Sequence, residues 1–388
     1  MRDVMTELEA WWRAGESVGV GTVVGTWKSS PRQPGAAMLV GPDGTVVGSV
    51  SGGCVEGAVY ELAHAARDSG EPVLQRYGVS DDDAFAVGLT CGGIIDVFVE
   101  QVDRASFPEL GDIADDIREG RPVAVATLIT DVPSGGRAGR RLVLRDGVAT
   151  GTLGSDRLDA ALHDDVVGML QQGRTGIVHY GPDGERRGDD IAVFVAAYAP
   201  RPRMIVFGAI DFAAAVARIG SFLGYRVTVC DARATFATPK RFPDADEVIV
   251  EWPHRYLEKS FQSGEIDERT VVCVLTHDPK FDVPLLELAL RMPLAYVGAM
   301  GSRRTNDDRE ARLRELGLTD QELERLHAPI GLDVGARTPE ETAVSIVAEI
   351  IALRWGGSGS QLRQTDGPIH HEPDFASILP DAVVSRPS

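Results

Sequence analysis

The chain has 388 residues, of which 43% are hydrophobic and 25% charged, as in soluble globular proteins large enough for two domains. Its 58 acidic and 39 basic residues give a net charge of −19, which disfavours nucleic acid and anionic membranes as partners. No apolar run approaches the roughly 20 residues of a membrane span, and residues 1–16 lack the apolar segment of a signal peptide. We therefore expect a cytoplasmic protein that binds neither nucleic acid nor membrane.

The first half of the chain reads as two copies of one α+β unit, residues 17–100 and 122–196. Each copy predicts an opening strand, a hairpin with an Asp-Gly turn, a helix (55–69 and 156–172) and a closing strand. Three landmarks recur at an offset of 103 residues, namely Asp43-Gly44 with Asp146-Gly147, Gly48 with Gly151, and Tyr77-Gly78 with Tyr180-Gly181. We expect the two copies to share one fold.

The first copy carries two cysteine loops that the second copy lacks. Where the first reads Ser51-Gly52-Gly53-Cys54, the second reads Gly154-Ser155-Asp156-Arg157. The offset falls from 103 to 96 residues by the closing strand, so the first copy has an insertion, and this holds Leu89-Thr90-Cys91-Gly92-Gly93. Duplication followed by drift explains the repeat, but not why both cysteines fall in glycine loops of the same copy. We therefore place a site in the first copy and regard the second as structural support.

The position of these cysteines suggests chemistry with a thiolate. Cys54 follows a predicted strand and precedes a predicted helix, and Cys91 precedes the predicted strand 94–100. Glycines let a ligand approach the backbone, and a helix N-terminus offers N–H groups and a positive dipole that favour a thiolate. A soft thiolate suits molybdenum, copper or sulfur transfer better than magnesium or calcium. The alternative, a small buried hydrophobic residue, fits Cys230 and Cys273, which lie in apolar runs.

The four cysteines lie far apart without a Cys-x-x-Cys pair, which predicts neither a disulfide framework nor a zinc site. Four motifs together resemble those of the xanthine dehydrogenase accessory protein (XdhC/CoxI) family, and the resemblance extends over residues 15–354. They are Ser51-Gly-Gly-Cys-Val-Glu56, Thr90-Cys-Gly-Gly93, Tyr296-Val-Gly-Ala-Met-Gly-Ser-Arg-Arg-Thr305 and Ile330-Gly-Leu-Asp-Val-Gly-Ala-Arg-Thr-Pro-Glu-Glu341. The resemblance implies an N-terminal cysteine-loop domain, here residues 1–198, and a C-terminal Rossmann-type domain, here residues 203–355.

The resemblance also implies an accessory factor rather than a turnover enzyme. Such a factor binds the molybdenum cofactor (molybdopterin), assists its sulfuration and delivers it to a xanthine or carbon monoxide dehydrogenase-type molybdenum hydroxylase. The cofactor-binding residues implied in the first domain are Gly52, Gly53, Cys54, Glu56, Cys91, Gly92 and Gly93, with Cys54 and Cys91 contacting molybdenum or its terminal sulfur. A cysteine desulfurase is a candidate partner beside the hydroxylase client, and we expect a homo-oligomer.

The second half predicts a doubly wound sheet. Segment 197–203, with two prolines, is the predicted linker. A strand at 204–207, a helix at 211–223 and a strand at 227–230 follow it, as in the opening βαβ unit of a Rossmann-like domain. Further strands are predicted near 246–250, 271–275 and 294–297. The fold class is therefore α/β, with a duplicated α+β domain before a Rossmann-like parallel sheet.

The glycine fingerprint of a dinucleotide site is defective. The expected G-x-G-x-x-G/A appears as Gly208-Ala209-Ile210-Asp211-Phe212-Ala213, whereas the family usually has Gly-Ala-Gly-His at this point. Ile210 would obstruct a pyrophosphate, and Asp211 opposes its charge at the helix N-terminus. Asp231 could still bond a ribose hydroxyl, and Arg233 could meet a 2′-phosphate. We expect weak or absent NAD(P) binding, and an NAD(P)-dependent oxidoreductase is the alternative function.

Loops at the carboxyl ends of the strands offer further candidates, because ligands of open α/β sheets bind there. The candidate cofactor-binding residues of this domain are Gly208, Asp231, Arg233, His277, Ser302, Arg303 and Arg304. Arginines and helix N-termini receive anions, and the molybdenum cofactor carries a phosphate. The alternatives are a solvated helix face and an ordinary loop histidine. Thr338 is expected to begin a helix with a capping box, and residues 356–388 to form a flexible tail.

Overall fold

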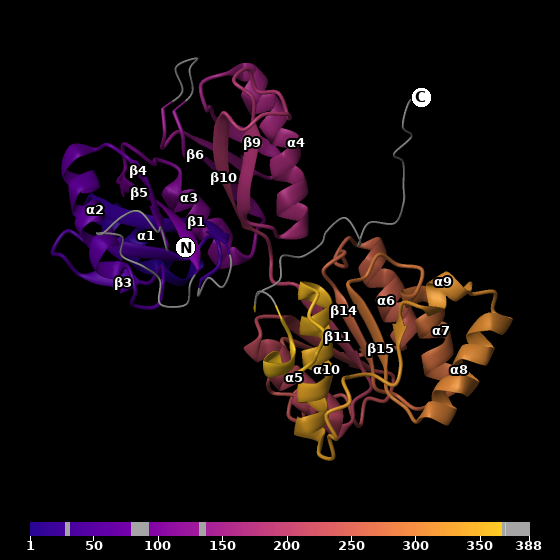
Figure 1. Ribbon diagram of the computed structural model, residues 1–388. Helices are drawn as coiled ribbons and strands as arrows, with labels where there is room; N and C mark the ends of the chain where they lie inside the picture. Colours follow the sequence, from indigo (N-terminus) through magenta and orange to yellow (C-terminus); the bar gives the residue numbers. More distant parts are fainter. Residues whose placement is uncertain (28–31, 79–92, 132–136, 367–368, 370–388) are drawn as a thin grey trace. The chain divides into compact units, whose positions relative to one another are not determined.

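The computed structural model describes residues 1–27, 32–78, 93–131, 137–366 and 369. They form two compact units, Met1–Pro200 and a second that begins at Arg201 (Figure 1). Each unit has hydrophobic cores of its own. No helix in the described part of the chain combines the length and the apolar character that a membrane span requires.

The N-terminal unit contains two five-stranded antiparallel sheets. The elements up to the end of the first copy are η1 (Arg2–Val4), α1 (Met5–Ala14), β1 (Val18–Trp27), β2 (Ala37–Val40), β3 (Val46–Gly48), α2 (Glu56–Ser69), β4 (Val73–Tyr77) and β5 (Ile94–Val102). After α3 (Leu110–Glu119), the second copy consists of β6 (Val123–Leu128), β7 (Arg141–Arg145), β8 (Val148–Gly151), α4 (Asp156–Gln172), β9 (Gly176–Tyr180) and β10 (Ile191–Tyr198). The strand orders, β3-β2-β1-β5-β4 and β8-β7-β6-β10-β9, place equivalent strands in equivalent positions.

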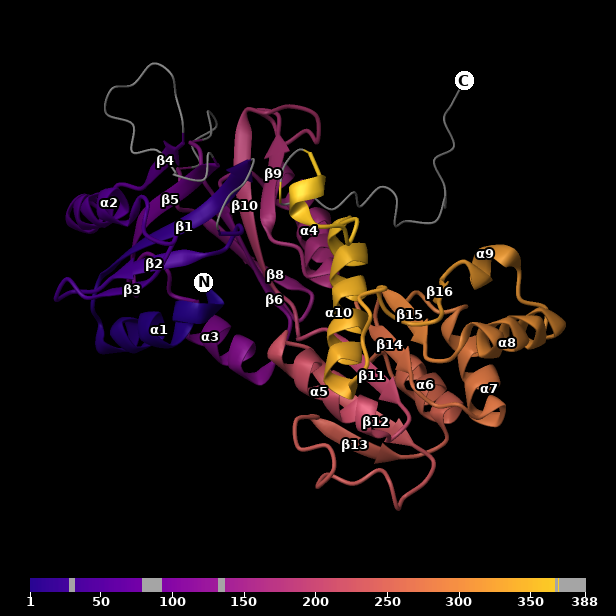
Figure 2. The same cartoon turned by 60° about the horizontal axis from the view of Figure 1, so that its bottom comes forward.

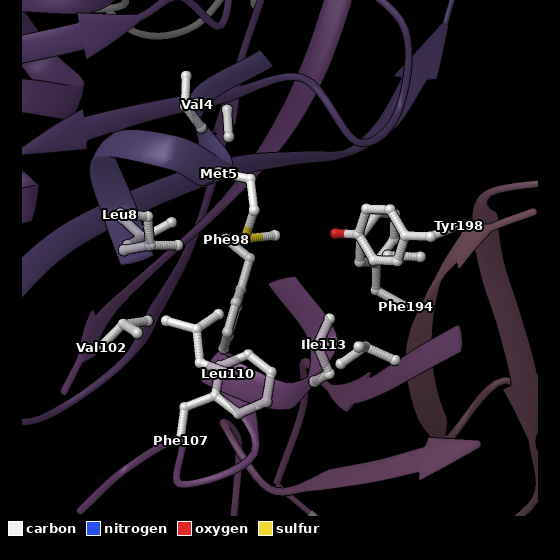
Figure 3. Close-up of a cluster of buried hydrophobic side chains, with 14 of the residues drawn as sticks. Val4, Met5, Leu8, Phe98, Val102, Phe107, Leu110, Ile113, Phe194 and Tyr198 are labelled. Carbon is white, nitrogen blue, oxygen red and sulfur yellow. The ribbon is translucent and has the colours of Figure 1, made fainter. Parts of the chain in front are cut away.

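Each sheet of this unit has one helix on one face and shares a core with the other sheet on its opposite face. The alternation of β1 sends Val18 and Val20 to the shared core and Val23 to the other face. α1 and α3 complete the shared core, to which the two sheets contribute Phe98 and Phe194 (Figure 3). Beneath α2 lies a second cluster, here called the α2 cluster, consisting of Val23, Met38, Val40, Val50, Val55, Val59, Ala63, Ala66, Tyr77, Ile95, Val97 and Val99. An equivalent cluster lies beneath α4.

A buried ion pair crosses the shared core. Nη2 of Arg141 on β7 lies 2.5 Å from Oε1 of Glu100 on β5, and both side chains are at least nine-tenths buried. The Arg141 guanidinium also lies 4.2 Å from the ring centroid of Phe107 and donates a hydrogen bond of 3.1 Å to the carbonyl of Gly139. A cavity of about 30 Å³ lies beside the pair, and Tyr198 also lines it. The ion pair therefore joins the two copies through a largely apolar interior.

The C-terminal unit is a parallel sheet between two layers of helices. Its elements are β11 (Arg203–Phe207), α5 (Asp211–Phe222), β12 (Arg226–Asp231), β13 (Glu247–Val250), α6 (Pro253–Gln262), β14 (Val271–Val274), α7 (Pro279–Ala289), β15 (Tyr296–Ala299), α8 (Arg303–Glu315), α9 (Asp320–Leu323), β16 (Leu326–His327), α10 (Pro339–Trp355) and η2 (Leu362–Gln364). The strand order is β13-β12-β11-β14-β15-β16, and every pair is parallel. α5 and α10 cover one face, and α6, α7 and α8 cover the other (Figures 1 and 2). This is the doubly wound Rossmann-type arrangement that the sequence predicts.

Two sequence-based boundaries are wrong. The linker is shorter than 197–203, because β10 continues to Tyr198 through pairing with β6 and β11 begins at Arg203. The strand expected at 294–297 starts at Tyr296, because the N–H of Leu294 donates to the carbonyl of Met292 in a local turn and not to a neighbouring strand. The described part of the expected tail contains η2. The capping box at Thr338 is confirmed, and α10 begins one residue later.

Candidate functional site

The cysteine loop of the first copy joins the end of β3 to the start of α2. Cys54 is partly buried and packs against the α2 cluster, to which Val55 belongs. Gly52 and Gly53 have φ angles of +77° and +117°, which side chains other than glycine rarely adopt, and a Cβ added to either would meet no atom within 4 Å. The loop therefore exposes two glycines beside the thiol-bearing residue, with open space next to them.

Glu56, the first residue of α2, folds its carboxylate back onto this loop. Its Oε1 accepts hydrogen bonds from the Ser49 hydroxyl (2.6 Å) and the Ser51 N–H (2.9 Å). Its Oε2 accepts from the Ser51 hydroxyl (2.5 Å) and from the N–H groups of Gly53 (2.8 Å) and Val55 (3.2 Å). Five donors converge on this carboxylate, which therefore determines the shape of the loop.

The N–H groups of the loop that leads into this helix are taken up by acceptors inside the loop. Besides the N–H groups bound by Glu56, those of Cys54 (2.9 Å) and Val55 (3.0 Å) donate to the Ser51 hydroxyl oxygen, and that of Gly52 donates to Ser49 (2.9 Å). The N–H groups of residues 51–55 are thus bonded within the loop. An internal carboxylate occupies the place at the helix N-terminus where an external anion would otherwise be favoured.

Glu56 is held as a carboxylate by these contacts. Burial would raise its pKa, but the hydrogen bonds from Ser49, Ser51 and the backbone outweigh burial and lower the pKa to about 2. Hydrogen bonds to the charged form of an acid have this effect in general. We therefore regard Glu56 as a positioning residue for the cysteine loop rather than as a group that binds a ligand itself.

The second copy builds the same kind of loop without a cysteine. Asp159 stands 103 residues after Glu56, and its carboxylate accepts hydrogen bonds from the Thr152 hydroxyl (2.5 Å) and the Leu153 N–H (2.9 Å). The Thr152 hydroxyl in turn accepts from the N–H of Gly154 (3.0 Å). The carboxylate scaffold thus belongs to the repeated fold, and the thiol is what distinguishes the first copy.

Three side chains at the end of the first sheet form a group that the sequence does not indicate. Arg76 donates two hydrogen bonds to Asp96, of 2.7 and 2.8 Å, and its guanidinium lies 4.7 Å from the ring centroid of Trp27, which is 40% exposed. The residues come from three strands, and only the sheet register brings Arg76 opposite Asp96. In the second copy, the paired positions hold His179 and Ala192. This group is therefore also specific to the cysteine-bearing copy.

The remaining cysteines divide into two kinds. Cys91 and Gly92 lie outside the described residues, and Gly93 directly precedes β5. Cys230 and Cys273 are fully buried, as predicted, and burial raises the pKa of the Cys273 thiol to about 12. Within the described ranges, no three His, Cys, Asp or Glu side chains form a group that could hold a metal ion.

In the C-terminal unit, the glycine loop after β11 is closed by its own neighbours. Gly208 has a φ of +110°, and a Cβ there would lie 2.9 Å from the backbone nitrogen of Thr276, so glycine permits the approach of two loops. The N–H of Ala209 donates to Asp231 (2.8 Å). Arg233 donates to the same carboxylate from its backbone N–H and from both arms of its guanidinium, at 2.8 to 2.9 Å. The residues expected to meet a ribose and a 2′-phosphate therefore bind each other.

Arg241, which lies outside the glycine fingerprint, binds the start of α5. Ile210 is the residue before α5 and packs against the core of the unit. Asp211 is exposed, and Arg241 donates to its carboxylate at 3.1 Å and to the carbonyl of Ala209 at 3.0 Å. The negative charge at the helix N-terminus is therefore partly neutralised within the protein itself.

We expect NAD and NADP to bind the unaltered protein too weakly for detection at roughly millimolar concentration. Ile210 obstructs the pyrophosphate, whose N–H···O contacts need about 2.7–3.2 Å, and Asp231 already has its full set of donors. Ile210→Gly combined with Asp211→His should raise the affinity for both, and Arg233→Ala should raise the affinity for NAD further by releasing Asp231. Titration calorimetry measures this directly. Tight binding by the unaltered protein would contradict the steric argument.

The other predicted residues of this unit lie at the carboxyl edge of the sheet. His277 follows β14 and is exposed. Ser302 caps α8, its hydroxyl accepting from the N–H of Thr305 at 3.1 Å, and Arg303 and Arg304 are exposed in the first turn. Arginines are not favoured by the dipole at a helix N-terminus. A bound anion would make that arrangement more favourable.

A buried ion pair that the sequence does not mark lies beneath these loops. Arg309 on α8 donates to Asp282 on α7 at 3.2 Å and to the carbonyl of Met300 at 2.9 Å. The hydroxyl of Thr276 donates to the same carboxylate. Burial raises the pKa of Asp282 despite these contacts. The group ties the loop after β14 to the loop after β15, and it is structural.

These features together define a class of protein: a duplicated α+β unit that carries a cysteine loop, followed by a Rossmann-type unit. The XdhC and CoxI family matches residues 11–78 and 116–181, and the XdhC Rossmann domain matches residues 204–350. The chain therefore belongs to the XdhC/CoxI family. The matched residues include the Cys54 loop and the equivalent part of the second copy.

Relatives of known sequence and structure support this membership. The chain is 29% identical over 356 residues to a Bacillus subtilis protein named as a probable subunit of xanthine dehydrogenase, covering 91% of this chain and 98% of that protein. It is 26% identical over 341 residues to the molybdenum cofactor insertion chaperone PaoD of Escherichia coli, covering 88% and 85% of the two chains. The solved structure of a Bacillus halodurans protein described as a xanthine dehydrogenase matches with a TM-score of 0.63 and 26% identity, covering 97% and 99% of the two chains.

Proposed function

We propose that this protein binds the molybdenum cofactor at the Cys54 loop and delivers it to a molybdenum hydroxylase of the xanthine dehydrogenase type. The observation that carries the proposal is the difference between the two copies: both have a loop ordered by a carboxylate, and only the first adds a thiol. A fold that needed the loop for structure alone would not need Cys54. The names of the relatives, a cofactor insertion chaperone and a subunit of xanthine dehydrogenase, point to the same class of function.

The residues of the first copy fit such a ligand. Cys54 supplies a soft sulfur ligand of the kind that molybdenum accepts, and Gly52 and Gly53 leave open space beside it. Glu56 holds the loop in this shape before the cofactor arrives, which lowers the entropic cost of binding. When bound, the cofactor supplies the redox-active metal that the client needs.

Two further parts of the proposal concern sulfur and phosphate. The chain holds the cofactor while a separate sulfur donor, a cysteine desulfurase, modifies it. Within the C-terminal unit taken by itself, Arg303 and Arg304 at the start of α8 are candidates for binding a phosphate, because they are exposed and lie at a helix N-terminus. An NAD(P)-dependent oxidoreductase is disfavoured by the contact between Asp231 and Arg233, which uses the groups that a dinucleotide would need.

Replacing Cys54 by alanine should reduce cofactor retention by about ten-fold or more, since residues around a bound metal typically contribute that much to affinity. The fold should be unchanged, because Cys54 is only partly buried. The protein would be purified from a host that makes the cofactor, with molybdenum measured by elemental analysis and the released pterin by mass spectrometry. Arg157→Ala, at the corresponding exposed position of the second copy, is the matched control. Full retention by folded Cys54→Ala and Cys91→Ala variants would refute the proposal.

A further inference from the structure

The cysteine loop occupies the place that the first helical turn takes in the second copy. At the offset of 103 residues, Gly53-Cys54-Val55 corresponds to Asp156-Arg157-Leu158. Helix α4 includes all three of these residues, whereas α2 begins only at Glu56, which corresponds to Asp159. The buried positions of the two helices coincide at this offset: Val59 with Leu162, Ala63 with Val166 and Ala66 with Met169. Helix α2 therefore lacks about one turn at its start.

A serine and a glycine stand in opposite order just before this segment. The first copy reads Ser51-Gly52, and the second reads Gly154-Ser155. Ser155 is the N-cap of α4, because its backbone is extended and its hydroxyl accepts from the N–H three residues later at 3.5 Å. The Ser51 hydroxyl, one position earlier, instead accepts from the N–H groups of Cys54 (2.9 Å) and Val55 (3.0 Å). The exchange thus moves the hydroxyl that binds these N–H groups by one residue.

Gly52 and Gly53 keep the segment out of the helical conformation. Their φ angles are +77° and +117°, whereas an α-helix requires about −63°. A Cβ added to either would meet no atom within 4 Å, so the backbone conformation, and not crowding, requires glycine at these positions. The second copy has Ser155 and Asp156 there, and both residue types favour the start of a helix. The sequences of the two copies therefore specify a loop in the first and a helical turn in the second.

We infer that Ser51, Gly52 and Gly53 are positioning residues, which unwind the first turn of α2 and thereby set the place of the Cys54 thiol. The inference rests on the proposed function and deepens it. As the loop stands, Cys54 is partly buried and packs against the α2 cluster. Wound into a helix, Cys54 would take the position of Arg157, which is exposed on α4. The cofactor is therefore retained because of where the loop holds the thiol, and the presence of a thiol is not sufficient.

Gly53→Ala tests the role of the backbone conformation, because alanine rarely adopts a φ of +117°. We expect cofactor retention by the full chain to fall about ten-fold, as the loop leaves its present shape. Gly57→Ala is the matched control. Gly57 is also exposed and also has open space around it, but it lies in the first turn of α2 without a positive φ. This variant should keep wild-type retention and raise the melting temperature slightly, because alanine favours helix.

A graft of the second copy's sequence, Ser51→Gly with Gly52→Ser and Gly53→Asp, should wind the missing turn while keeping Cys54. Cofactor retention should again fall about ten-fold or more. Alkylation of Cys54 by iodoacetamide, located by peptide mass spectrometry, should become faster, because the thiol moves from a partly buried to an exposed position. The probe for retention is molybdenum cofactor released from purified xanthine dehydrogenase, with bound pterin and molybdenum measured after anaerobic gel filtration.

Wild-type retention in Gly53→Ala and in the graft, with reduced retention in Cys54→Ala, would overturn this inference and leave the proposed function standing. An unchanged alkylation rate of Cys54 in the graft would also overturn it, because the thiol would not have moved. Equal loss of retention in Gly53→Ala and Gly57→Ala would do the same, because the positive φ would then be irrelevant. Failure of the unaltered protein to retain any cofactor would instead overturn the proposed function.

Discussion

Replacing Glu100 by alanine is expected to lower the stability of the N-terminal unit by about 3–5 kcal/mol. The substitution leaves the Arg141 guanidinium buried in the shared core without the carboxylate that lies 2.5 Å from it. The other contacts of Arg141, with the Phe107 ring and the carbonyls of Ser106 and Gly139, do not neutralise its charge. For a unit of this size, the melting temperature should fall by roughly 6–20 °C. Differential scanning calorimetry of the full chain measures the change.

Two further variants distinguish the cost of leaving a buried charge unpaired from the cost of removing side-chain volume. Changing both residues, Glu100→Met with Arg141→Met, removes the pair while keeping the core filled, and should cost much less or even stabilise the unit. Glu287→Ala breaks the solvent-accessible pair between Glu287 on α7 and Arg291, which follows that helix, and should cost no more than about 1 kcal/mol. If Glu100→Ala were as mild as Glu287→Ala, the pair would not be buried in solution as described.

The elements with strong local signals are predictable from the sequence. The helix expected at 156–172 is α4 as observed, and α2 starts one residue later than expected. Both helices end at glycines in the left-handed conformation, Gly70 and Gly173, which are local stop signals. The repeat offset of 103 residues also predicts that the strands of the two copies take equivalent places in their sheets. Such features depend on residues close together in the chain.

The contacts of the candidate site are less predictable, because they join residues from different strands. The contact of Arg76 with Asp96 and Trp27 depends on the register of β4 against β5 and of β5 against β1. Arg233 and Asp231 are only two residues apart and bind each other. The dinucleotide fingerprint, however, suggests that Asp231 binds a ribose. In the structure, the Asp231 carboxylate instead accepts hydrogen bonds from Arg233, two residues further along the chain.

The role of Glu56 has a sequence signal that only comparison of the two copies reveals. A hydroxyl residue precedes a carboxylate by seven positions in both, as Ser49 with Glu56 and Thr152 with Asp159. One such pair would be a chance match, but its recurrence at the repeat offset indicates a contact. The same comparison distinguishes the two buried tyrosines: Tyr180 donates its hydroxyl to Asp165, whereas the structure gives the Tyr77 hydroxyl no such bond among the described residues.

Replacing Glu56 by alanine should abolish most cofactor retention, with a loss of roughly 100-fold. The variant removes the acceptor for donors from Ser49, Ser51, Gly53 and Val55, so the loop that presents Cys54 loses its defined shape. Preorganisation of a site accounts for a large share of affinity. Because the loop is partly exposed and water replaces some of these bonds, the stability of the unit should fall by only about 1–2 kcal/mol.

The pH dependence of the unaltered loop follows from the same carboxylate. The pKa of Glu56 is lowered from 4.5 to about 2, so its contribution to stability is complete above about pH 4.5 and is lost as the pH falls toward 2. Loop order, measured by hydrogen exchange of residues 51–55, should therefore stay constant between pH 5 and 8. In Glu56→Ala, exchange of these N–H groups should be faster throughout that range.

Conservative variants and the second copy make the test of Glu56 specific. Glu56→Asp matches the residue that orders the second loop and should retain part of the cofactor, whereas Glu56→Gln places an amide N–H₂ among donors and should not. Asp159→Ala removes the corresponding carboxylate and should reduce stability to a similar degree without affecting retention, because its loop has no cysteine. If Asp159→Ala and Glu56→Ala lost the cofactor equally, the effect would be one of stability, and the assignment of Glu56 as the residue that positions Cys54 would be wrong.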